Sequence, residues 1–172
     1  MNYPTQGASK KAEKEEARLE RLYIEKHSAE FSGKMDHQFP LTIFKGSVSS
    51  DNQITSGSTL DIWSIIDNHL NIYELKKHTG NDKVGIITEI LYYVCVLDDL
   101  FKHKVNYDAG AAKCSFRTFN EIYSLYSNSE KVSISGYLLC DRTHPLINDK
   151  VLNLMSNNAN KLNFEYKKLD VQ

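Results

Sequence analysis

Two acids and a lysine within residues 59–77 (TLDIWSIIDNHLNIYELKK) have the types and spacing of a catalytic site. Strand-forming residues flank Asp67–Asn68, and an Asx pair tolerates the positive φ of a two-residue hairpin turn. In a hairpin with this turn, Asp61 lies opposite Glu74. Because side chains alternate between the two faces of a strand, Lys76 lies on the same face. The stretch therefore predicts two carboxylates and one ammonium group together on an otherwise apolar face.

This arrangement favours metal-assisted chemistry. Two carboxylates on an apolar face repel each other and lose hydration, so positive charge must offset them. Lys76 supplies one charge, and a divalent cation would supply the rest. Mg²⁺ prefers oxygen ligands and typically uses one or two carboxylates with water and substrate phosphate. Such a metal activates water and neutralises a phosphoryl oxygen, while a lysine orients or deprotonates the water or stabilises the transition state.

Acid-x-Lys alone is a weak signal, because a second copy occurs at Glu165-Tyr166-Lys167. That copy belongs to an alternating segment, and we interpret it as part of a solvated face. Only Glu74 has an acid placed opposite it by a short hairpin, on an apolar face, before an apolar helix. The plain alternative for the first copy is a buried ion-pair cluster without activity.

The elements that must position these residues are a buried hairpin and its covering helices. The strands predicted over residues 60–66 and 69–77 are apolar on both faces, which is typical of the interior of a sheet. Residues 83–103 predict a helix that is apolar around most of its girth and is buried against the hairpin. Residues 11–31 predict a helix rich in Ala, Glu and Lys. The hairpin face opposite the acids carries Leu60, Ile62, Ile66, Tyr73 and Leu75.

The rest of the chain predicts one α/β domain. We expect residues 1–10 to be a disordered lead and residues 11–172 to form a mixed β-sheet flanked by helices. The remaining elements are strands over 39–48, 131–140 and 161–169 and helices over 116–126 and 145–156, with a bulge at Gly136.

The motif and the element order resemble the PD-(D/E)xK nuclease superfamily, which includes restriction endonucleases, Holliday-junction resolvases and RecB-type nuclease domains. Asp61 is followed after twelve residues by Glu74-Leu75-Lys76 at a strand end, and then by a buried helix. The residue before Asp61 is Leu60 instead of proline. The resemblance implies a restriction-endonuclease-like core of helix, three strands, helix and strand, followed here by one more helix and strand.

The resemblance also implies roles for the motif residues. Asp61, Glu74 and the backbone carbonyl of Leu75 would bind Mg²⁺, for which Mn²⁺ can substitute, and Lys76 would be the catalytic lysine. The implied activity is that of a metal-dependent endo- or exonuclease that hydrolyses phosphodiester bonds, in DNA in preference to RNA.

Further residues are candidates for supporting roles. Glu89 and Tyr93 resemble the Gln-x-x-x-Tyr element of RecB-type members, with Glu in place of Gln. A hydrogen-bonded pair on a helix surface explains them equally well. Many superfamily members have an acid on the first helix, for which Glu20 is the candidate here, with Glu16 close behind. Glutamates are common throughout that segment, so an ordinary surface role competes for both.

Binding partners are less clearly indicated. Lys77, His78 and Lys83 follow the motif closely and are weak candidates for contact with a nucleic-acid backbone. The formal net charge of −1 neither requires nor excludes a polyanionic partner. The size of the chain, 172 residues, suggests a homodimer or a subunit of a larger nuclease complex. No membrane partner is expected, since the apolar stretches are too short to span a bilayer.

The composition places the chain among soluble globular proteins, with 41% hydrophobic and 25% charged residues. No basic start followed by an apolar run indicates a signal peptide, so we expect a cytoplasmic location. Three cysteines without Cys-x-x-Cys spacing favour reduced thiols. Two alternatives to a DNA nuclease remain open: a catalytically inactive subunit of the same fold that binds nucleic acid or serves assembly, and an RNA-cleaving enzyme.

Overall fold

The predicted hairpin forms the centre of the sheet in the computed structural model, which describes residues 10–32, 34–76, 84–106, 119–128, 131–141, 144–158 and 162–170. Its strands are β2 (Thr59–Ile66) and β3 (His69–Lys76). The turn places Asp67 at a φ of 52°, in the left-handed region that an Asx residue tolerates. Ile66 lies opposite His69 and Ile62 opposite Tyr73, so the predicted register is confirmed over this part of the hairpin, while the predicted pair of Asp61 and Glu74 lies beyond the paired residues.

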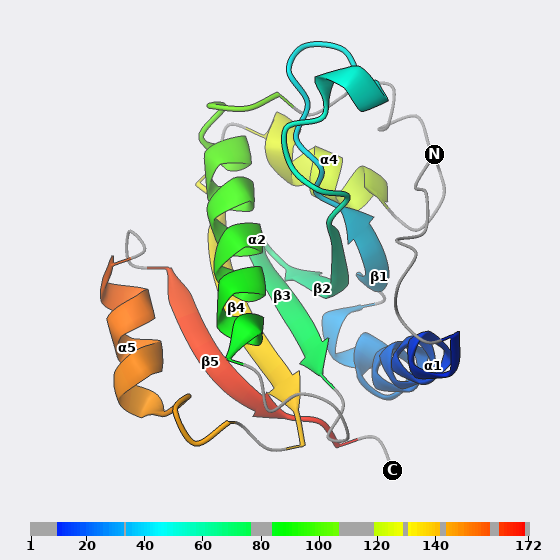
Figure 1. The fold of residues 1–172 in the computed structure, drawn as a ribbon, viewed down its shortest axis with the longest axis vertical. Helices are drawn as coiled ribbons and strands as arrows, with labels where there is room; N and C mark the ends of the chain where they lie inside the picture. The colour runs from blue at the N-terminus through cyan, green and yellow to red at the C-terminus, as the bar shows by residue number, and fades with distance from the viewer. Residues whose placement is uncertain are drawn as a thin grey trace.

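The fold is α/β, with a five-stranded mixed sheet whose strands follow the chain order (Figure 1). β1 (Met35–Pro40) pairs antiparallel with β2, and β2 pairs antiparallel with β3. β4 (Ser133–Cys140) pairs parallel with β3, and β5 (Asn163–Lys168) pairs parallel with β4. Because β3, β4 and β5 run parallel, their carboxyl ends lie at the same end of the sheet.

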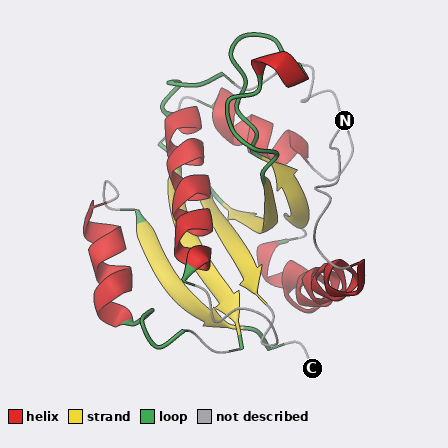
Figure 2. Cartoon of the chain, viewed as in Figure 1, coloured by secondary structure: helices red, strands yellow, loops and turns green. Residues whose placement is uncertain are grey.

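Helices cover both faces of this sheet, as expected for strands that are apolar on both sides (Figure 2). One face packs against α2 (Gly85–Phe101), α4 (Phe119–Ser127) and α5 (Asp149–Asn158). We call this hydrophobic cluster the α2-side core; it joins Trp63, Ile72, Leu138, Ile90, Val94, Leu97, Ile122, Leu152 and their neighbours. The other face packs against α1 (Lys10–His27) through the α1-side core, formed by Leu19, Tyr23, Met35, Ile62, Tyr73, Leu75, Leu139 and Leu169.

Several element boundaries differ from the sequence-based prediction. The first strand covers Met35–Pro40 and not residues 39–48, because Pro40 has no N–H to continue a ladder. The first helix gives way to a short 3₁₀ turn at Ser28–Phe31. Lys10 is already helical, and residues 1–9 of the predicted disordered lead lie outside the described residues. α5 begins at Asp149, where the Asn148 side chain accepts the Lys150 and Val151 N–H groups as an N-cap.

Gly136 is not a bulge, contrary to the prediction. It lies in unbroken register between Ile72 of β3 and Phe164 of β5. A Cβ on this residue would lie 2.9 Å from Val94 Cγ2 and 3.1 Å from Ile90 Cγ1, both on α2. The missing side chain therefore lets α2 approach β4 closely.

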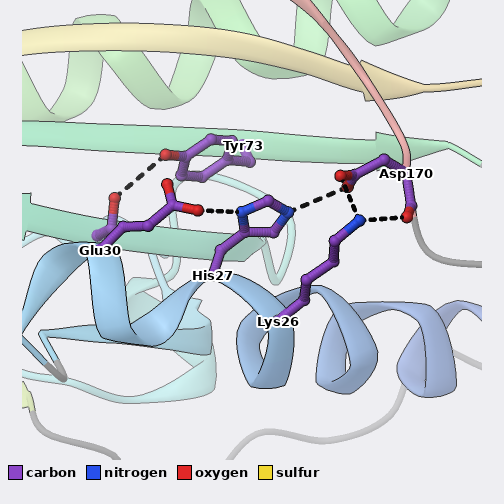
Figure 3. Close-up of polar contacts among 6 residues, drawn as sticks. Lys26, His27, Glu30, Tyr73 and Asp170 are labelled. Carbon is purple, nitrogen blue, oxygen red and sulfur yellow. Dashed lines mark hydrogen bonds and ion pairs between the residues drawn. The ribbon is translucent and has the colours of Figure 1, made fainter.

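α1 is fastened to the end of the chain beyond β5 (Figure 3). Lys26 Nζ donates to the backbone oxygen of Asp170 at 2.8 Å and forms an ion pair with its carboxylate. The His27 ring bridges two carboxylates, with Nε2 3.0 Å from Asp170 and Nδ1 2.7 Å from Glu30. Hydrogen bonds from Lys26 and His27 lower the pKa of Asp170 to about 2. This fastening fixes the position of the helix that carries Glu20.

No helix in the described part of the chain has the length and apolar character needed to cross a membrane. The described thiols of Cys95 and Cys140 are free.

Replacing Gly136 with alanine should lower the free energy of unfolding by about 1–3 kcal/mol, because the added Cβ overpacks the contact with α2. Gly57→Ala is the matched control, since no atom lies within 4 Å of a Cβ at that position. It should change stability by less than about 0.5 kcal/mol. Urea denaturation of the two variants and the parent protein measures both effects. Equal stability of the two variants would mean that α2 is not held against β4 in this way.

Candidate functional site

The site is organised around a break in β2 at Asp61. β1 pairs with β2 through His37–Ile62 and Phe39–Leu60, and the position between them is unpaired. On the other side, the described pairing of β2 with β3 reaches only Ile62 and Tyr73. The Leu75 N–H instead donates to the carboxylate of Asp61, with the nitrogen 2.8 Å from Oδ2. Asp61 thus lies at a one-residue gap in the pairing of β2 with β1 and just beyond the end of the described pairing of β2 with β3.

The break bends β2 near its beginning, as its path in Figure 1 shows. Strict alternation predicts Leu60 on the same face as Ile62, but Leu60 packs in the α2-side core. Phe39, its partner on β1, packs there too. The prediction for Leu60 was wrong because the interruption at Asp61 reverses the alternation of side chains for the residues that precede it in β2.

A chain of ionic contacts runs from β3 to α2. Glu74 is 2% exposed, and its Oε1 lies 2.5 Å from Lys76 Nζ. The same ammonium group lies 3.0 Å from Oε2 of Glu89 on α2. Lys76 therefore bridges a buried carboxylate and an exposed one, at the carboxyl end of β3.

The electrostatics of the site are dominated by burial of like charges. Burial raises the pKa of Glu74 well above its usual value, the charge of Asp61 raises it further, and Lys76 opposes both. Burial likewise raises the pKa of Asp61 to about 7; Lys76 and the Leu75 N–H lower it, while the charge of Glu20 adds to the rise. Burial lowers the pKa of Lys76, but the carboxylates of Glu74 and Asp61 outweigh that effect and raise it overall. The lysine is therefore protonated at neutral pH.

Glu20 of α1, which packs on the opposite face of the sheet, contacts β1. Its side chain is 4% exposed and accepts hydrogen bonds from two β1 residues that the sequence did not single out. Gln38 Nε2 lies 3.0 Å from Oε1 and 3.1 Å from Oε2, and His37 Nδ1 lies 3.1 Å from Oε2. The sequence feature that pointed to His37 and Gln38 is the run Asp36-His37-Gln38, whose residues are poor strand formers although they lie in a strand.

Gln38 has a left-handed backbone, with a φ of 59°. For a residue that is not glycine, such a conformation costs roughly 1 kcal/mol or more and persists only where the surroundings impose it. The three other non-glycine residues with positive φ in the described chain, Ser32, Asp67 and His103, lie outside the strands. Strain inside a strand beside buried carboxylates is typical of a functional position.

Glu89 and Tyr93 also lie at the site. Partial burial raises the pKa of Glu89, but a hydrogen bond from the protonated carboxyl group of Glu74, together with the charge and hydrogen bond of Lys76, lowers it overall. Tyr93 is buried, and its hydroxyl donates to the Thr59 carbonyl at 3.1 Å, which ties α2 to the start of β2. Burial and the charges of Glu74 and Asp61 raise the pKa of Tyr93, so its hydroxyl stays neutral. Both predicted supporting residues are thus brought to the site; Lys77, His78 and Lys83 lie outside the described residues.

The second acid-x-Lys copy lies on the other face of the sheet. Glu165 is exposed as predicted, and its Oε1 accepts from Asn163 Nδ2 at 2.6 Å. Lys167 is not simply solvated, as was predicted. It is half-buried, with Nζ 5.5 Å from the ring centre of Tyr73 and 6.0 Å from that of Tyr23. This lysine packs on the aromatic rings of the α1-side core, away from the carboxylate pair.

A divalent cation fits the donors at this site. The described residues contain no group of three or more His, Cys, Asp or Glu side chains arranged to hold a metal ion. The pair of Asp61 and Glu74 nevertheless matches the one or two carboxylates that Mg²⁺ uses. Oε2 of Glu74 is buried and receives no hydrogen bond from a donor group in the described chain, while the carboxyl groups of Glu74 and Glu89 lie within hydrogen-bonding reach of each other when one is protonated. Burying an ionised carboxylate near a second one costs free energy, and a positive charge close to the pair lowers that cost.

The raised carboxyl pKa values predict how stability depends on pH when metal is chelated. Asp61 and Glu74 hold protons more tightly in the folded state, so the free energy of unfolding should fall as the pH rises from about 4 through 7. Glu74→Gln removes one buried charge, should flatten this fall, and should stabilise the protein at pH 8 by on the order of 1 kcal/mol. Asp170 titrates below this window. Urea denaturation in EDTA across the pH range measures the profile.

The matched control is Glu165→Gln, which removes the exposed acid of the second copy and should leave the profile unchanged. If Glu74→Gln had the same profile as the parent protein, Glu74 would not be a buried charge in solution.

Comparison with known proteins adds no assignment: no family model matches this sequence, and no curated protein or solved structure matches it. The roles predicted for Asp61, Glu74, Lys76 and their neighbours stay predictions. A function for the site has to be inferred from its own residues and contacts.

Proposed function

We propose that this protein is a metal-dependent nuclease of the PD-(D/E)xK type that hydrolyses phosphodiester bonds, in DNA in preference to RNA. The observation that carries the proposal is the ion pair of the buried Glu74 with Lys76, next to an Asp61 whose charge acts on both of them. These are the residue types that phosphoryl hydrolysis needs: carboxylates for a cation and an ammonium group for developing negative charge.

The order of elements supports a restriction-endonuclease-like fold. α1 is followed by the three strands β1, β2 and β3, then by the buried helix α2 and by β4. This matches the helix, three strands, helix and strand expected from the resemblance. The sheet is mixed, and α5 and β5 follow the core as the sequence predicted.

The residues of the site have different roles in the proposed hydrolysis. Asp61, Glu74 and the Leu75 carbonyl would hold Mg²⁺, which when bound neutralises charge on the phosphoryl group and acidifies bound water. In hydrolysis the water oxygen bonds to phosphorus, the bond to the leaving oxygen breaks, and the leaving oxygen takes up a proton. Lys76, whose ammonium group is paired with Glu74, would orient the attacking water and stabilise negative charge on the phosphoryl group.

One observation favours the alternative of a non-catalytic subunit with the same fold, which would bind nucleic acid or serve assembly. Lys76 is already paired with both Glu74 and Glu89, so the cluster is partly neutralised without a metal. In that case the acids and the lysine would only stabilise the end of the sheet.

Cleavage assays separate the two functions. The purified protein is incubated with single- and double-stranded DNA and with RNA, in Mg²⁺, Mn²⁺ or EDTA. We expect metal-dependent cleavage, reduced about 100-fold or more by Asp61→Asn, Glu74→Gln or Lys76→Met, since each removes a group that stabilises the transition state. Glu165→Gln and Lys167→Met, in the second acid-x-Lys copy, are the matched controls and should retain activity.

Cleavage that persists in Glu74→Gln or Lys76→Met would rule out this site as its source. Absence of cleavage, together with nucleic-acid binding that EDTA does not alter, would support the non-catalytic subunit.

A further inference from the structure

We propose that His27 makes the docking of α1 sensitive to pH: its ring holds the end of α1 while it is positively charged and loosens it when it loses a proton. The contacts of His27 with Glu30 and Asp170, together with the ion pair of Lys26 and Asp170, are called the α1 latch below. The latch involves neither the proposed metal ligands nor nucleic acid, so it stands apart from the proposed function.

The contacts of His27 require a doubly protonated ring. Nδ1 lies 2.7 Å from Oε1 of Glu30, and Nε2 lies 3.0 Å from Oδ1 of Asp170 (Figure 3). A neutral imidazole has one N–H and one lone pair, whereas the cation has two N–H donors. In the neutral ring, one nitrogen lone pair would therefore face a carboxylate oxygen at hydrogen-bond distance. Only the cation makes both contacts favourable.

The latch joins three segments of the chain. His27 and Lys26 end α1, Glu30 belongs to the 3₁₀ turn that follows, and Asp170 lies beyond β5. Two carboxylates contact the His27 ring directly, while the nearest cation on its own helix, Lys26, is paired with one of them. The side chain of His27 is 13% exposed, so these contacts are partly shielded from water. The charges around the ring therefore favour its protonated form.

Tyr23 connects the latch to the α1-side core. Its ring centre lies 4.4 Å from that of His27 and 5.8 Å from that of Tyr73 on β3. A second cation, Lys167 of β5, has its Nζ 6.0 Å from the Tyr23 ring centre. Burial raises the pKa of both phenols, to about 12 for Tyr73 and higher still for Tyr23, so neither loses a proton in the range where histidine does.

The docked position of α1 contains an unfavourable feature that the latch offsets. Tyr23 is fully buried, and its hydroxyl has no hydrogen-bond partner among the described residues. Burying an unpaired hydroxyl costs free energy, which is regained when the helix moves away and water reaches the group. Weakening an ionic contact at the end of α1 therefore shifts the balance toward opening of this helix.

The latch should weaken as the pH rises. The docked state binds the His27 proton through two carboxylates, whereas the open state leaves the ring in water. The stabilisation is therefore complete at acidic pH and is lost as the pH rises through and above about 6.5, where histidine in water loses its proton. Asp170 stays ionised throughout this range, because hydrogen bonds from Lys26 and His27 lower its pKa to about 2.

Hydrogen exchange of the parent protein tests the latch. The amide protection of α1 is compared with that of α2 at about pH 5.5 and about pH 8.5, on either side of the histidine range, after division by the unfolded-chain rate at each pH. We expect the protection of α1 relative to α2 to fall about tenfold, since one charge-assisted hydrogen bond between partly exposed groups is lost. Nitrogen NMR should show both ring nitrogens of His27 protonated at the lower pH.

Two variants assign the effect to His27. His27→Gln can donate to one acid only and does not titrate, so its α1 protection should be lower at acidic pH and nearly independent of pH. Glu30→Gln should also reduce the dependence, because an amide can accept from or donate to a neutral ring. His144→Gln is the matched control: Nδ1 of His144 accepts the Leu146 N–H and meets no carboxylate among the described residues. This variant should keep the dependence of the parent protein.

Equal relative protection of α1 at the two pH values would overturn the inference, and so would a neutral His27 ring at the lower pH. A second histidine, His37, contacts α1 through Glu20. If the pH dependence persisted unchanged in His27→Gln, the effect would belong to His37 and the latch would be wrong. If His27→Gln did not fold, the ring protonation in the parent protein and the exchange of Glu30→Gln would decide. None of these outcomes depends on whether the protein cleaves nucleic acid.

Discussion

The repulsion between two carboxylates, Asp61 and Glu74, is the constraint on which the rest of the structure depends. Glu74 is almost fully buried, and burial penalises the ionised form of both groups. Positive charge must therefore lie close by, and Lys76 provides it from the same strand, two residues along. Lys76 is shared with Glu89, so the strand and α2 are held together by the charge that the acids require. The charged cluster thus helps to hold the carboxyl end of β3 against α2.

Packing decides how closely the parts of this site approach. The absence of a side chain at Gly136 lets α2 lie low over β4, and the Tyr93 hydroxyl then reaches the Thr59 carbonyl at the start of β2. On the opposite face, the ion pairs of Lys26 and His27 with Asp170 fasten α1 to the end of the chain. α1 and α2 therefore pack on opposite faces of the sheet, and each contributes one glutamate, Glu20 from α1 and Glu89 from α2.

The two acid-x-Lys copies show why the tripeptide alone has little meaning. Glu74 lies on the α2 side of a central strand, in electrostatic contact with a second acid. Glu165 lies on the edge strand and is exposed, while Lys167 packs over the rings of Tyr23 and Tyr73. Identical spacing thus leads to a carboxylate pair in one case and to a cation–aromatic contact in the other, because the neighbouring strands differ.

The sequence by itself determined the hairpin, its register from Ile62–Tyr73 to Ile66–His69 and the placement of Glu74 beside Lys76, because these depend on a short turn and on strict alternation over a few residues. It also indicated the buried helix over Gly85–Phe101, since apolar residues covered most of its girth. Only the tertiary structure decided the break at Asp61 and the contacts of Glu20 with His37 and Gln38. Those contacts join residues far apart in the chain, and a left-handed glutamine inside a strand goes against local preference. No periodic pattern could predict the left-handed backbone of Gln38, because its unfavourable free energy is offset by contacts elsewhere in the fold.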